Sequence, residues 1–144
     1  MVLKEVKIRE EKPLDIPILE EIFLITRRAT FKNRSNEFHI GDYIQSTADD
    51  QVFVAEINGI ISGFVSIYSQ DNFIHNLFVA PQYQRQGFGS KLLLFAESYL
   101  SYPITLKVDI DNLKACQFYE KYGYYKVAEF NKAPEPYILY RKDS

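Results

Sequence analysis

The sequence predicts a single α/β (α+β) domain over residues 1–144, with a mixed, mostly antiparallel sheet of six or seven strands flanked by about four helices. Runs that alternate apolar and polar residues are interleaved with runs whose apolar residues recur at helical spacing. Asn58 and Gly59 join two of the strand-like runs, and this pair is the strongest short signal for a β-hairpin. The length of 144 residues and the 47% share of hydrophobic residues fit one globular domain with its own core.

The first half of the chain predicts a strand, two helices and then three antiparallel strands. Val6 and Ile8 alternate with charged residues, which predicts a first strand over about residues 4–9. Pro13 and Asp15 open a helix that extends to about residue 31. Its predicted buried face consists of Ile18, Ile22, Ile25 and Ala29. The polar residues 32–38 predict a loop, a short helix follows over about residues 40–46, and the three strands cover residues 52–57, 60–68 and 73–79.

The second half predicts a helix, a strand, a further helix and a final pair of strands. The first helix covers about residues 88–101, and its apolar face is formed by Leu92, Leu93, Ala96, Tyr99 and Leu100. A strand over residues 104–108 follows. Asp111 or Asn112 caps a helix over residues 113–122, and Gly123 is placed for a left-handed C-terminal cap. The last two strands lie near residues 124–130 and 137–142.

Composition and charge argue against several classes of protein. The net charge of −2 is not that of a general nucleic-acid binder, which usually has a basic excess. The single cysteine, Cys116, provides neither an internal disulfide nor a set of metal ligands, so we expect a cytoplasmic protein without a metal. No run approaches the ~18 apolar residues of a membrane span, and charges interrupt the N-terminal segment where a signal peptide needs an apolar core. We therefore expect neither nucleic acid nor a membrane as a partner, while a homodimer stays open.

Residues 77–90, LFVAPQYQRQGFGS, form the segment with the clearest functional signal. It runs from a predicted strand through a turn into Gln84-x-x-Gly87-x-Gly89, directly before a helix. Glycines at such a junction let backbone N–H groups approach a ligand, and the first turn of a helix adds unpaired donors and the positive end of its dipole. The segment therefore predicts a site for a phosphate or pyrophosphate.

Two phosphate-binding motifs do not fit this segment. A P-loop ends in Gly-Lys-Ser/Thr, whereas Gly89 is followed by Ser90 and then Lys91. A dinucleotide fingerprint needs a third glycine, where this chain has Leu92, although Asp109 is placed for the acid about 20 residues on. Residues 80–86 also separate the strand from the first glycine. The remaining alternative is a helix start whose glycines serve packing alone.

A third interpretation comes from resemblance. Gln84-x-x-Gly87-x-Gly89, preceded by Leu77-x-Val79-x-Pro81, resembles the acetyl-CoA signature of the GNAT superfamily of N-acetyltransferases. A later segment, Asn112-x-x-Ala115-x-x-Phe118-Tyr119-x-x-Tyr122-Gly123-Tyr124, is similar to a second segment of that family, at a typical interval. The predicted strand order agrees over nearly the whole chain. The resemblance implies a GNAT-like acyl-CoA N-acyltransferase fold and acetyl-CoA as the cosubstrate.

The resemblance also implies which residues hold the acetyl donor. The pyrophosphate is expected to accept from the N–H groups of the turn that follows Gln84, namely those of Arg85, Gln86, Gly87, Phe88, Gly89 and Ser90. The preceding strand would offer the backbone of Leu77, Phe78 and Val79 to the pantetheine arm, as an added strand does. Asn112 is expected to cap its helix and to contact the CoA arm, and the Leu77 N–H to polarise the thioester carbonyl.

For proton transfer, Tyr119 matches the family tyrosine that lies near the sulfur of CoA and acts as the general acid, because a neutral phenol can donate a proton. Cys116 is expected to be a buried thiol without an activating base. His75 lies two residues before Leu77, where related enzymes often have a glutamate, and strand alternation places it on the face of Leu77 unless a bulge resets the phase. An imidazole suits the role of base at neutral pH. His39 and a base acting through water are the alternatives.

The loop before residue 50 is expected to line the acceptor pocket, with Arg28, Phe31 and His39 as contacts. We therefore predict an acetyl-CoA-dependent N-acetyltransferase that transfers the acetyl group directly to a primary amine, without an acyl-enzyme. The acidic composition and the aromatic residues near this loop favour a small-molecule acceptor. A protein N-terminus or lysine is the enzymatic alternative, and a non-catalytic acyl-CoA-binding domain is the alternative from another class.

Overall fold

The computed structural model describes residues 5–144, which form seven strands and four α-helices. The strands are β1 (Val6–Glu10), β2 (Gln51–Ile57), β3 (Ile60–Tyr68), β4 (Phe73–Val79), β5 (Ile104–Asp109), β6 (Tyr125–Phe130) and β7 (Tyr137–Lys142). The helices are α1 (Ile16–Thr30), α2 (Asp42–Thr47), α3 (Phe88–Tyr99) and α4 (Leu113–Lys121), and short 3₁₀ turns cover Pro13–Asp15, Lys32–Glu37, Ser69–Asp71 and Pro81–Tyr83. The start of the first predicted strand, at residue 4, lies outside the described residues.

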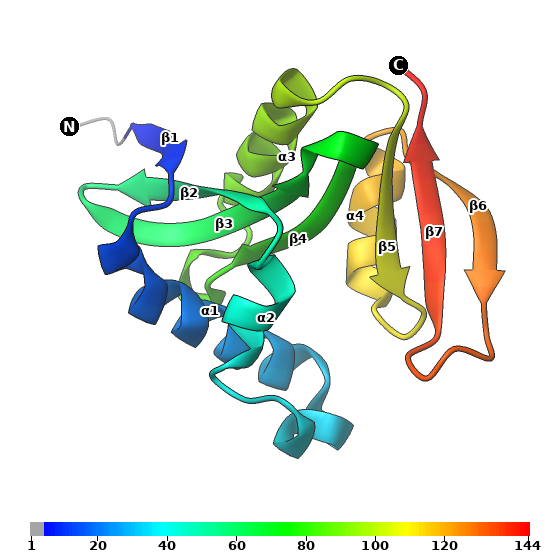
Figure 1. Cartoon of the computed structure of the whole chain (residues 1–144), viewed down its shortest axis with the longest axis horizontal. Coiled ribbons are helices and arrows are strands. Elements are labelled where there is room, and N and C mark those ends of the chain that lie inside the picture. Colours follow the sequence, from blue (N-terminus) through cyan, green and yellow to red (C-terminus); the bar gives the residue numbers. More distant parts are fainter. Residues whose placement is uncertain (1–4) are drawn as a thin grey trace.

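The strands form one mixed sheet in the order β1-β2-β3-β4-β5-β7-β6. Neighbouring strands are antiparallel, with the exception of the parallel pair β4 and β5. Helices α1 and α2 lie against one face of the sheet and α3 and α4 against the other, as Figure 1 shows. The sheet, its mixed pairing and the flanking helices confirm the predicted fold class.

Each face of the sheet has its own hydrophobic core. The larger core lies under α3 and α4 and includes Leu92, Leu93, Ile104, Leu106 and Tyr119. The smaller core lies under α1 and α2, where the rings of Phe23, Tyr43, Phe64 and Phe78 meet mostly edge to face, with centroids 5.0–6.2 Å apart. Two cores on opposite faces hold the middle strands in place, so the site built on β4 has a rigid support.

The buried face of α1 differs from the prediction. Leu19, Ile22, Phe23 and Thr26 point into the core, whereas Ile18 and Ile25 are 46% and 44% exposed and Ala29 is exposed as well. Both sets recur at helical spacing, so periodicity alone does not separate them. The set that contains Phe23 is buried because its ring fills the space between Tyr43, Phe64 and Phe78.

Three further expectations are corrected by the structure. Residues 32–38 are not an open loop, because Lys32–Glu37 forms a 3₁₀ segment between the buried rings of Phe31 and Phe38. The short helix begins two residues later than predicted, at Asp42, whose carboxylate accepts from the His39 N–H at 2.9 Å. Tyr99, predicted to be buried, is 46% exposed at the end of α3.

The predicted turns are confirmed. Asn58 and Gly59 have φ values of +52° and +76°, which a tight hairpin requires. Gly123 has φ +95°, and the Tyr124 N–H donates to the Tyr119 carbonyl while the Gly123 N–H donates to that of Glu120. This is a Schellman cap, with the Tyr124 ring against that of Tyr119. Within residues 5–144, no helix combines the length and apolar character needed to cross a membrane.

Candidate active site

The two parallel strands at the centre of the sheet separate soon after they begin. Strand β4 pairs with β5 only at Phe73↔Thr105 and Ile74↔Leu106. On its other side, β4 stays paired with β3 through Leu77, Phe78 and Val79. The edge of Leu77–Val79 that faces β5 therefore has backbone groups free of ladder partners, as a sheet edge has. This edge can accept an extended ligand as an added strand.

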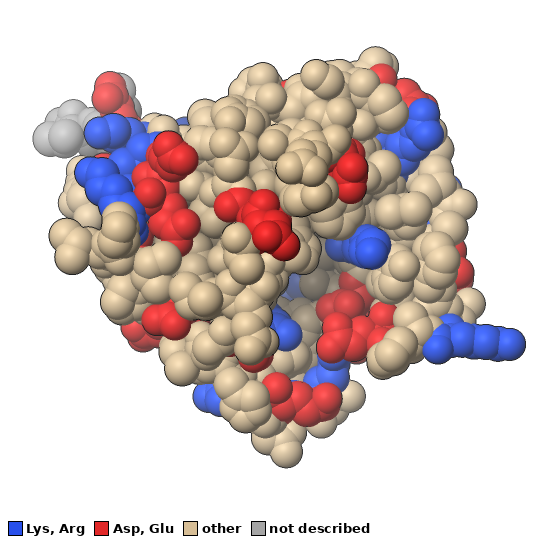
Figure 2. Space-filling view, in the orientation of Figure 1, with Lys and Arg blue, Asp and Glu red and all other residues tan. Residues whose placement is uncertain are grey.

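A cleft of about 630 Å³ opens where the strands diverge. Strand β4 contributes Leu77 and its neighbours, β5 contributes Asp109 and its neighbours, and α4 contributes Asn112, Ala115 and Tyr119. The far wall comes from α1 and from the loop between β6 and β7. Figure 2 shows the face on which a hollow lies between the α1/α2 half of the molecule and the β5/β7 half, with acidic side chains gathered at its rim.

The start of α3 has the backbone geometry that a phosphate site requires, and the turn from Arg85 to Ser90 is called the candidate cradle below. Arg85 and Gly87 adopt left-handed backbone conformations, with φ +64° and +86°, so the chain turns sharply before the helix. The Lys91 N–H is the first to reach back to a carbonyl of this turn, that of Gly87 at 3.2 Å. Helix geometry leaves the preceding N–H groups of Phe88, Gly89 and Ser90 without an intrahelical acceptor, at the positive end of the dipole.

Side chains of the turn support the cradle from outside. The Gln84 amide donates to the Val79 carbonyl at 3.0 Å, and the Ser90 hydroxyl donates to the Gly87 carbonyl at 2.9 Å. Phe88 is buried and packs edge to face on Tyr83, which anchors the first helical turn. A Cβ on Gly87 would meet no atom within 4 Å, so the space above it is open. The cradle is therefore exposed and shaped by backbone rather than by charged side chains.

Helix α4 brings the second predicted segment to the same cleft. The Asn112 carboxamide caps the helix by accepting from the Ala115 N–H at 3.2 Å. Tyr119 lines the cleft two turns later and is 8% exposed. Burial raises the pKa of the Tyr119 hydroxyl well above its ordinary value. The phenol therefore stays protonated over the neutral range, as a general acid must.

His75 lies at a β-bulge in β4. Ile74 is opposite Ile67 and Asn76 is opposite Ser66, so His75 is an extra residue in the ladder. The bulge resets the phase that strict alternation predicts: Leu77 packs against the α3/α4 core, whereas the His75 ring bonds to Asp50, just after α2. His75 is nevertheless one of the residues that line the cleft, together with Leu77 and Tyr119.

Of the three residues predicted to contact the acceptor, the structure places one in the cleft and two outside its lining. Phe31 is buried and lines the cleft. Arg28 donates to the Phe38 carbonyl at 2.8 Å on the exposed side of α1, and His39 is exposed near the start of α2. Neither lies among the residues that line the cleft, so their contact with an acceptor stays a prediction without geometric support.

Sequence reasoning missed the charged residues that do line this part of the cleft. Arg27, one position before Arg28, is held over the ring of Phe38 at 4.1 Å and donates to Asp42. Asp109 lies 3.7 Å from Arg34, and burial raises the pKa of its carboxyl. A helix turns by about 100° per residue, so Arg27 could be preferred to Arg28 only once the buried face of α1 was known.

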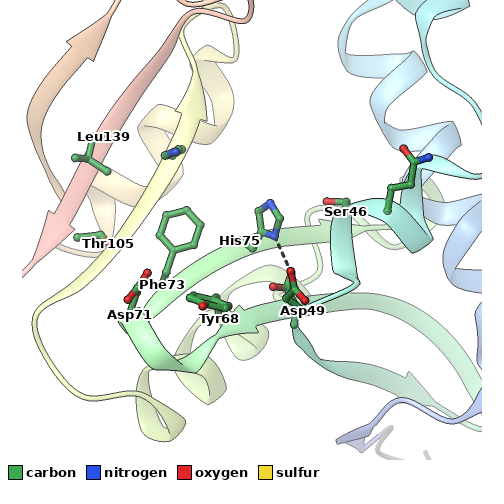
Figure 3. Close-up of a pocket in the computed structure, with 11 residues that line it drawn as sticks. Ser46, Asp49, Tyr68, Asp71, Phe73, His75, Thr105 and Leu139 are labelled. Carbon is green, nitrogen blue, oxygen red and sulfur yellow. Dashed lines mark hydrogen bonds and ion pairs between the residues drawn. The ribbon is translucent and has the colours of Figure 1, made fainter.

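A second cavity of about 590 Å³ adjoins the cleft and shares Ser46, Phe73, His75 and Lys107 with it. Figure 3 shows its floor, where Phe73 and His75 stand up side by side from β4, with Tyr68 below them and Ser46 beyond His75. No group of three or more His, Cys, Asp or Glu residues placed to hold a metal ion occurs within residues 5–144.

Comparisons with known proteins agree with this geometry. Residues 17–124 match the family model described as Acetyltransferase (GNAT) family. The chain is 30% identical over 135 residues to the uncharacterized N-acetyltransferase YafP of Escherichia coli (strain K12), with 88% of this chain and 86% of that protein covered.

Two solved structures show the same fold at lower identity. The PaiA N-acetyltransferase of Thermoplasma acidophilum, in complex with coenzyme A, has a TM-score of 0.79 at 20% identity, covering 97% of this chain and 99% of that one. The ribosomal-protein-S18-alanine N-acetyltransferase of Escherichia coli has a TM-score of 0.75 at 21% identity, covering 96% and 94%. The match over residues 17–124 and the relative at 30% identity confirm the acyltransferase class, and the chain belongs to the acetyltransferase (GNAT) family.

Proposed function

We propose that the protein is an acetyl-CoA-dependent N-acetyltransferase that transfers the acetyl group directly to a primary amine of a small molecule. The observation that carries the proposal is that one cleft joins the unpaired edge of β4 at Leu77 to the cap of α4 at Asn112 and to the buried hydroxyl-bearing ring of Tyr119. When bound, acetyl-CoA supplies the thioester carbon that an amine attacks.

The residues present fit such a donor. The N–H groups of Phe88, Gly89 and Ser90 offer several donors to a pyrophosphate, and each charge interaction at a helix end contributes ~0.3–1 kcal/mol. Gly89 lies between β4 and α4, where a Cβ would be 3.6 Å from the Phe118 ring and 3.8 Å from a Val79 methyl. The start of α3 is therefore in close reach of both the end of β4 and α4, the two elements that would hold the rest of the donor.

The groups along the cleft have the properties that acetyl transfer needs. The backbone N–H of Leu77, a residue that lines the cleft, polarises the thioester carbonyl, and losing one such donor typically costs ~2.7–4 kcal/mol of transition-state stabilisation. Tyr119, kept protonated by burial, donates a proton to the leaving sulfur. His75 accepts a proton from the acceptor ammonium, which becomes the attacking amine, and the second proton that the nitrogen loses on forming the amide replaces the one given up by Tyr119. Direct transfer needs no nucleophile on the enzyme, and Cys116 is buried away from the cleft lining.

The acceptor end of the cleft favours a small molecule. The whole cleft, donor part included, has a volume of about 630 Å³, which falls in the ~300–1,000 Å³ range of small-molecule sites. Its walls combine aromatic rings, such as Phe31 and Tyr137, with the charged side chains of Arg27, Asp109 and Glu135. We place the reaction in the cytoplasm, which suits the single free cysteine.

Release of free CoA thiol from acetyl-CoA tests the proposal. The panel of acceptors contains an aliphatic diamine, an aromatic ethylamine, an aminoglycoside, a peptide with a free N-terminus and a lysine peptide with a blocked N-terminus. Turnover of a small amine with poor turnover of both peptides supports the proposal. Preferential turnover of a peptide assigns the protein-acetylating alternative. CoA binding without turnover of any amine assigns the non-catalytic acyl-CoA-binding alternative.

A further inference from the structure

The structure places a second residue behind the imidazole of His75. His75 Nδ1 lies 2.7 Å from Asp50 Oδ2, and the Asp50 side chain is only 4% exposed whereas that of His75 is 40% exposed. Asp50 is fixed from two sides, because its N–H donates to the Thr47 carbonyl at 3.0 Å and β2 begins at the next residue. The dashed line in Figure 3 marks this contact below the ring.

The chemistry of this pair determines which ring nitrogen carries the proton. An ionised carboxylate can only accept hydrogen bonds, so a neutral imidazole bonded to it carries its proton on Nδ1. Nε2 then has a free lone pair, and the bond holds the ring in one orientation. Because the hydrogen bond made by one ring nitrogen of a histidine selects its tautomer, Asp50 determines which nitrogen of His75 is free to accept a proton.

His75 stands where the two cavities meet, so both an acceptor and water can reach it. Within residues 5–144, other charged and titratable groups line the two cavities around His75 without an observed hydrogen bond to its ring. Asp49, Asp71 and the phenol of Tyr68 line the same cavity, and Arg27, Asp109, Glu135, Tyr119 and Tyr137 line the adjoining cleft. The Lys107 ammonium lies against the Tyr137 and Phe73 rings, at 4.8 and 5.9 Å. Asp50 is the carboxylate in hydrogen-bond contact with the ring.

We propose that Asp50 is a positioning residue that holds His75 in the Nδ1–H tautomer, with Nε2 ready to take the acceptor's proton. The proposal rests on the proposed acetyl transfer. In the step, one proton moves from the acceptor ammonium to Nε2, which leaves a neutral amine and an imidazolium whose charge faces the Asp50 carboxylate. The imidazolium then returns the proton to water in the open cavity, so the base is regenerated.

A kinetic comparison tests the role of Asp50. Asp50→Asn keeps the shape of the side chain and removes its charge, and the neighbouring exposed Asp49→Asn is the matched control in the same cavity. With the best acceptor of the panel, Asp50→Asn should lower kcat by about 10- to 100-fold, within the range of general-base effects, while KM for acetyl-CoA stays within about twofold. Asp49→Asn should change kcat by less than about twofold. In a His75→Ala background, Asp50→Asn should add less than about threefold, because the two residues act as one unit.

Nitrogen NMR gives a readout that does not depend on activity. The chain has two histidines, His39 and His75, so His75→Ala assigns the ring signals directly. Near pH 8, the wild-type His75 ring should show the Nδ1–H tautomer, and Asp50→Asn should lose this preference while His39 is unchanged.

A wild-type ring in the Nε2–H tautomer would overturn the proposal without affecting the proposed function. Two kinetic results would also overturn it: an active enzyme whose kcat does not change in Asp50→Asn, or an Asp50→Asn change that lowers kcat as much in the His75→Ala background as in the wild type. A wild-type protein that binds CoA and acetylates no amine would overturn both proposals.

Discussion

Replacing Gly87 by valine tests the phosphate cradle most directly. Gly87 has φ +86° and ψ 4°, and a Cβ there would meet no protein atom within 4 Å. The Cβ of valine therefore meets no neighbouring segment, and the expected cost to the fold is the strain of a left-handed backbone conformation, about 1–3 kcal/mol of unfolding free energy. The added methyl groups would instead occupy the open space in front of the N–H groups of Phe88, Gly89 and Ser90.

The effect on binding can be worked out from those donors. Three interactions of ~0.3–1 kcal/mol each amount to about 1–3 kcal/mol, and every 1.4 kcal/mol is a tenfold change in Kd. We therefore expect Gly87→Val to weaken CoA binding by about 5- to 150-fold, before any steric exclusion of the pyrophosphate. Titration calorimetry with CoA measures this Kd, and thermal unfolding measures the cost to the fold.

Gly59→Val is the matched control. Gly59 has φ +76° in the β2–β3 hairpin and also has open space around its Cβ position, so it takes a comparable backbone strain away from the cleft. Both variants should lower the unfolding temperature by a similar amount, and only Gly87→Val should weaken CoA binding. Equal affinities for CoA in the wild type and in Gly87→Val would refute the cradle. An equal loss in both variants would show that general destabilisation, not the cradle, governs binding.

The remaining predictions concern proton transfer and stability. Tyr119→Phe should lower kcat by about 100-fold with little change in CoA affinity, and an unchanged kcat in the variant would show that Tyr119 takes no part in the reaction. Because burial raises the pKa of Tyr119, the wild-type kcat should not fall through ionisation of this phenol up to about pH 10. His75→Ala should lower kcat by about 100-fold and flatten the acidic limb of the pH–rate profile, and an unaltered profile would exclude it as the base. The Arg9 guanidinium, which donates to both oxygens of Asp15, holds the pKa of that carboxyl below its ordinary value. The folding stability that this ion pair adds is present above the ordinary carboxyl pKa of ~3.9 and is lost as the pH falls through the lowered pKa of the folded state. Asp15→Asn should therefore lower the unfolding free energy by about 2 kcal/mol at neutral pH and flatten its decline in acid. Urea unfolding at a series of pH values measures both effects.

The parts of the fold that were predictable from the sequence are those in which one local conformation is demanded by residue type. Asn58-Gly59 and Gly123 adopt positive φ values, which few residues accept, so their turns could be located from sequence alone. The buried face of α1 was not predictable in this way, because Ile18 and Ile25 are as apolar as the residues that replaced them. Packing against Tyr43 and Phe64, which come from distant segments, decided between the two faces.

The donor half of the proposed site could be predicted from the sequence better than the acceptor half, and the reason is similar. The glycines of the candidate cradle and the cap at Asn112 carry a local signal; the structure puts Gly89 near Val79 of β4 and Asn112 in the cleft that Leu77 also lines. Asp50 and Arg27 carry no such signal, because each is placed by contacts with residues far along the chain, namely His75 and Asp42. The bulge that turns His75 toward Asp50 depends on the register in which β3 and β4 pair, and this register could not be predicted from the sequences of the two strands.

Strand β4 explains why the donor side can be read from so few residues. Its pairing with β5 ends at Ile74, so the backbone edge at Leu77 faces the cleft with groups that must find partners in water or in a ligand. A ligand held by such an edge and by the N–H groups of α3 makes its contacts with the main chain. Main-chain contacts of this kind restrict the residue type only at the glycine positions. The acceptor side is built from side chains of α1, β5 and the β6–β7 loop, which can change without disturbing the edge. Under the proposed function, we therefore expect a change of acceptor to require substitutions at positions such as Arg27, Asp109 and Glu135, while the candidate cradle at Gly87 and the bulge at His75 stay as they are.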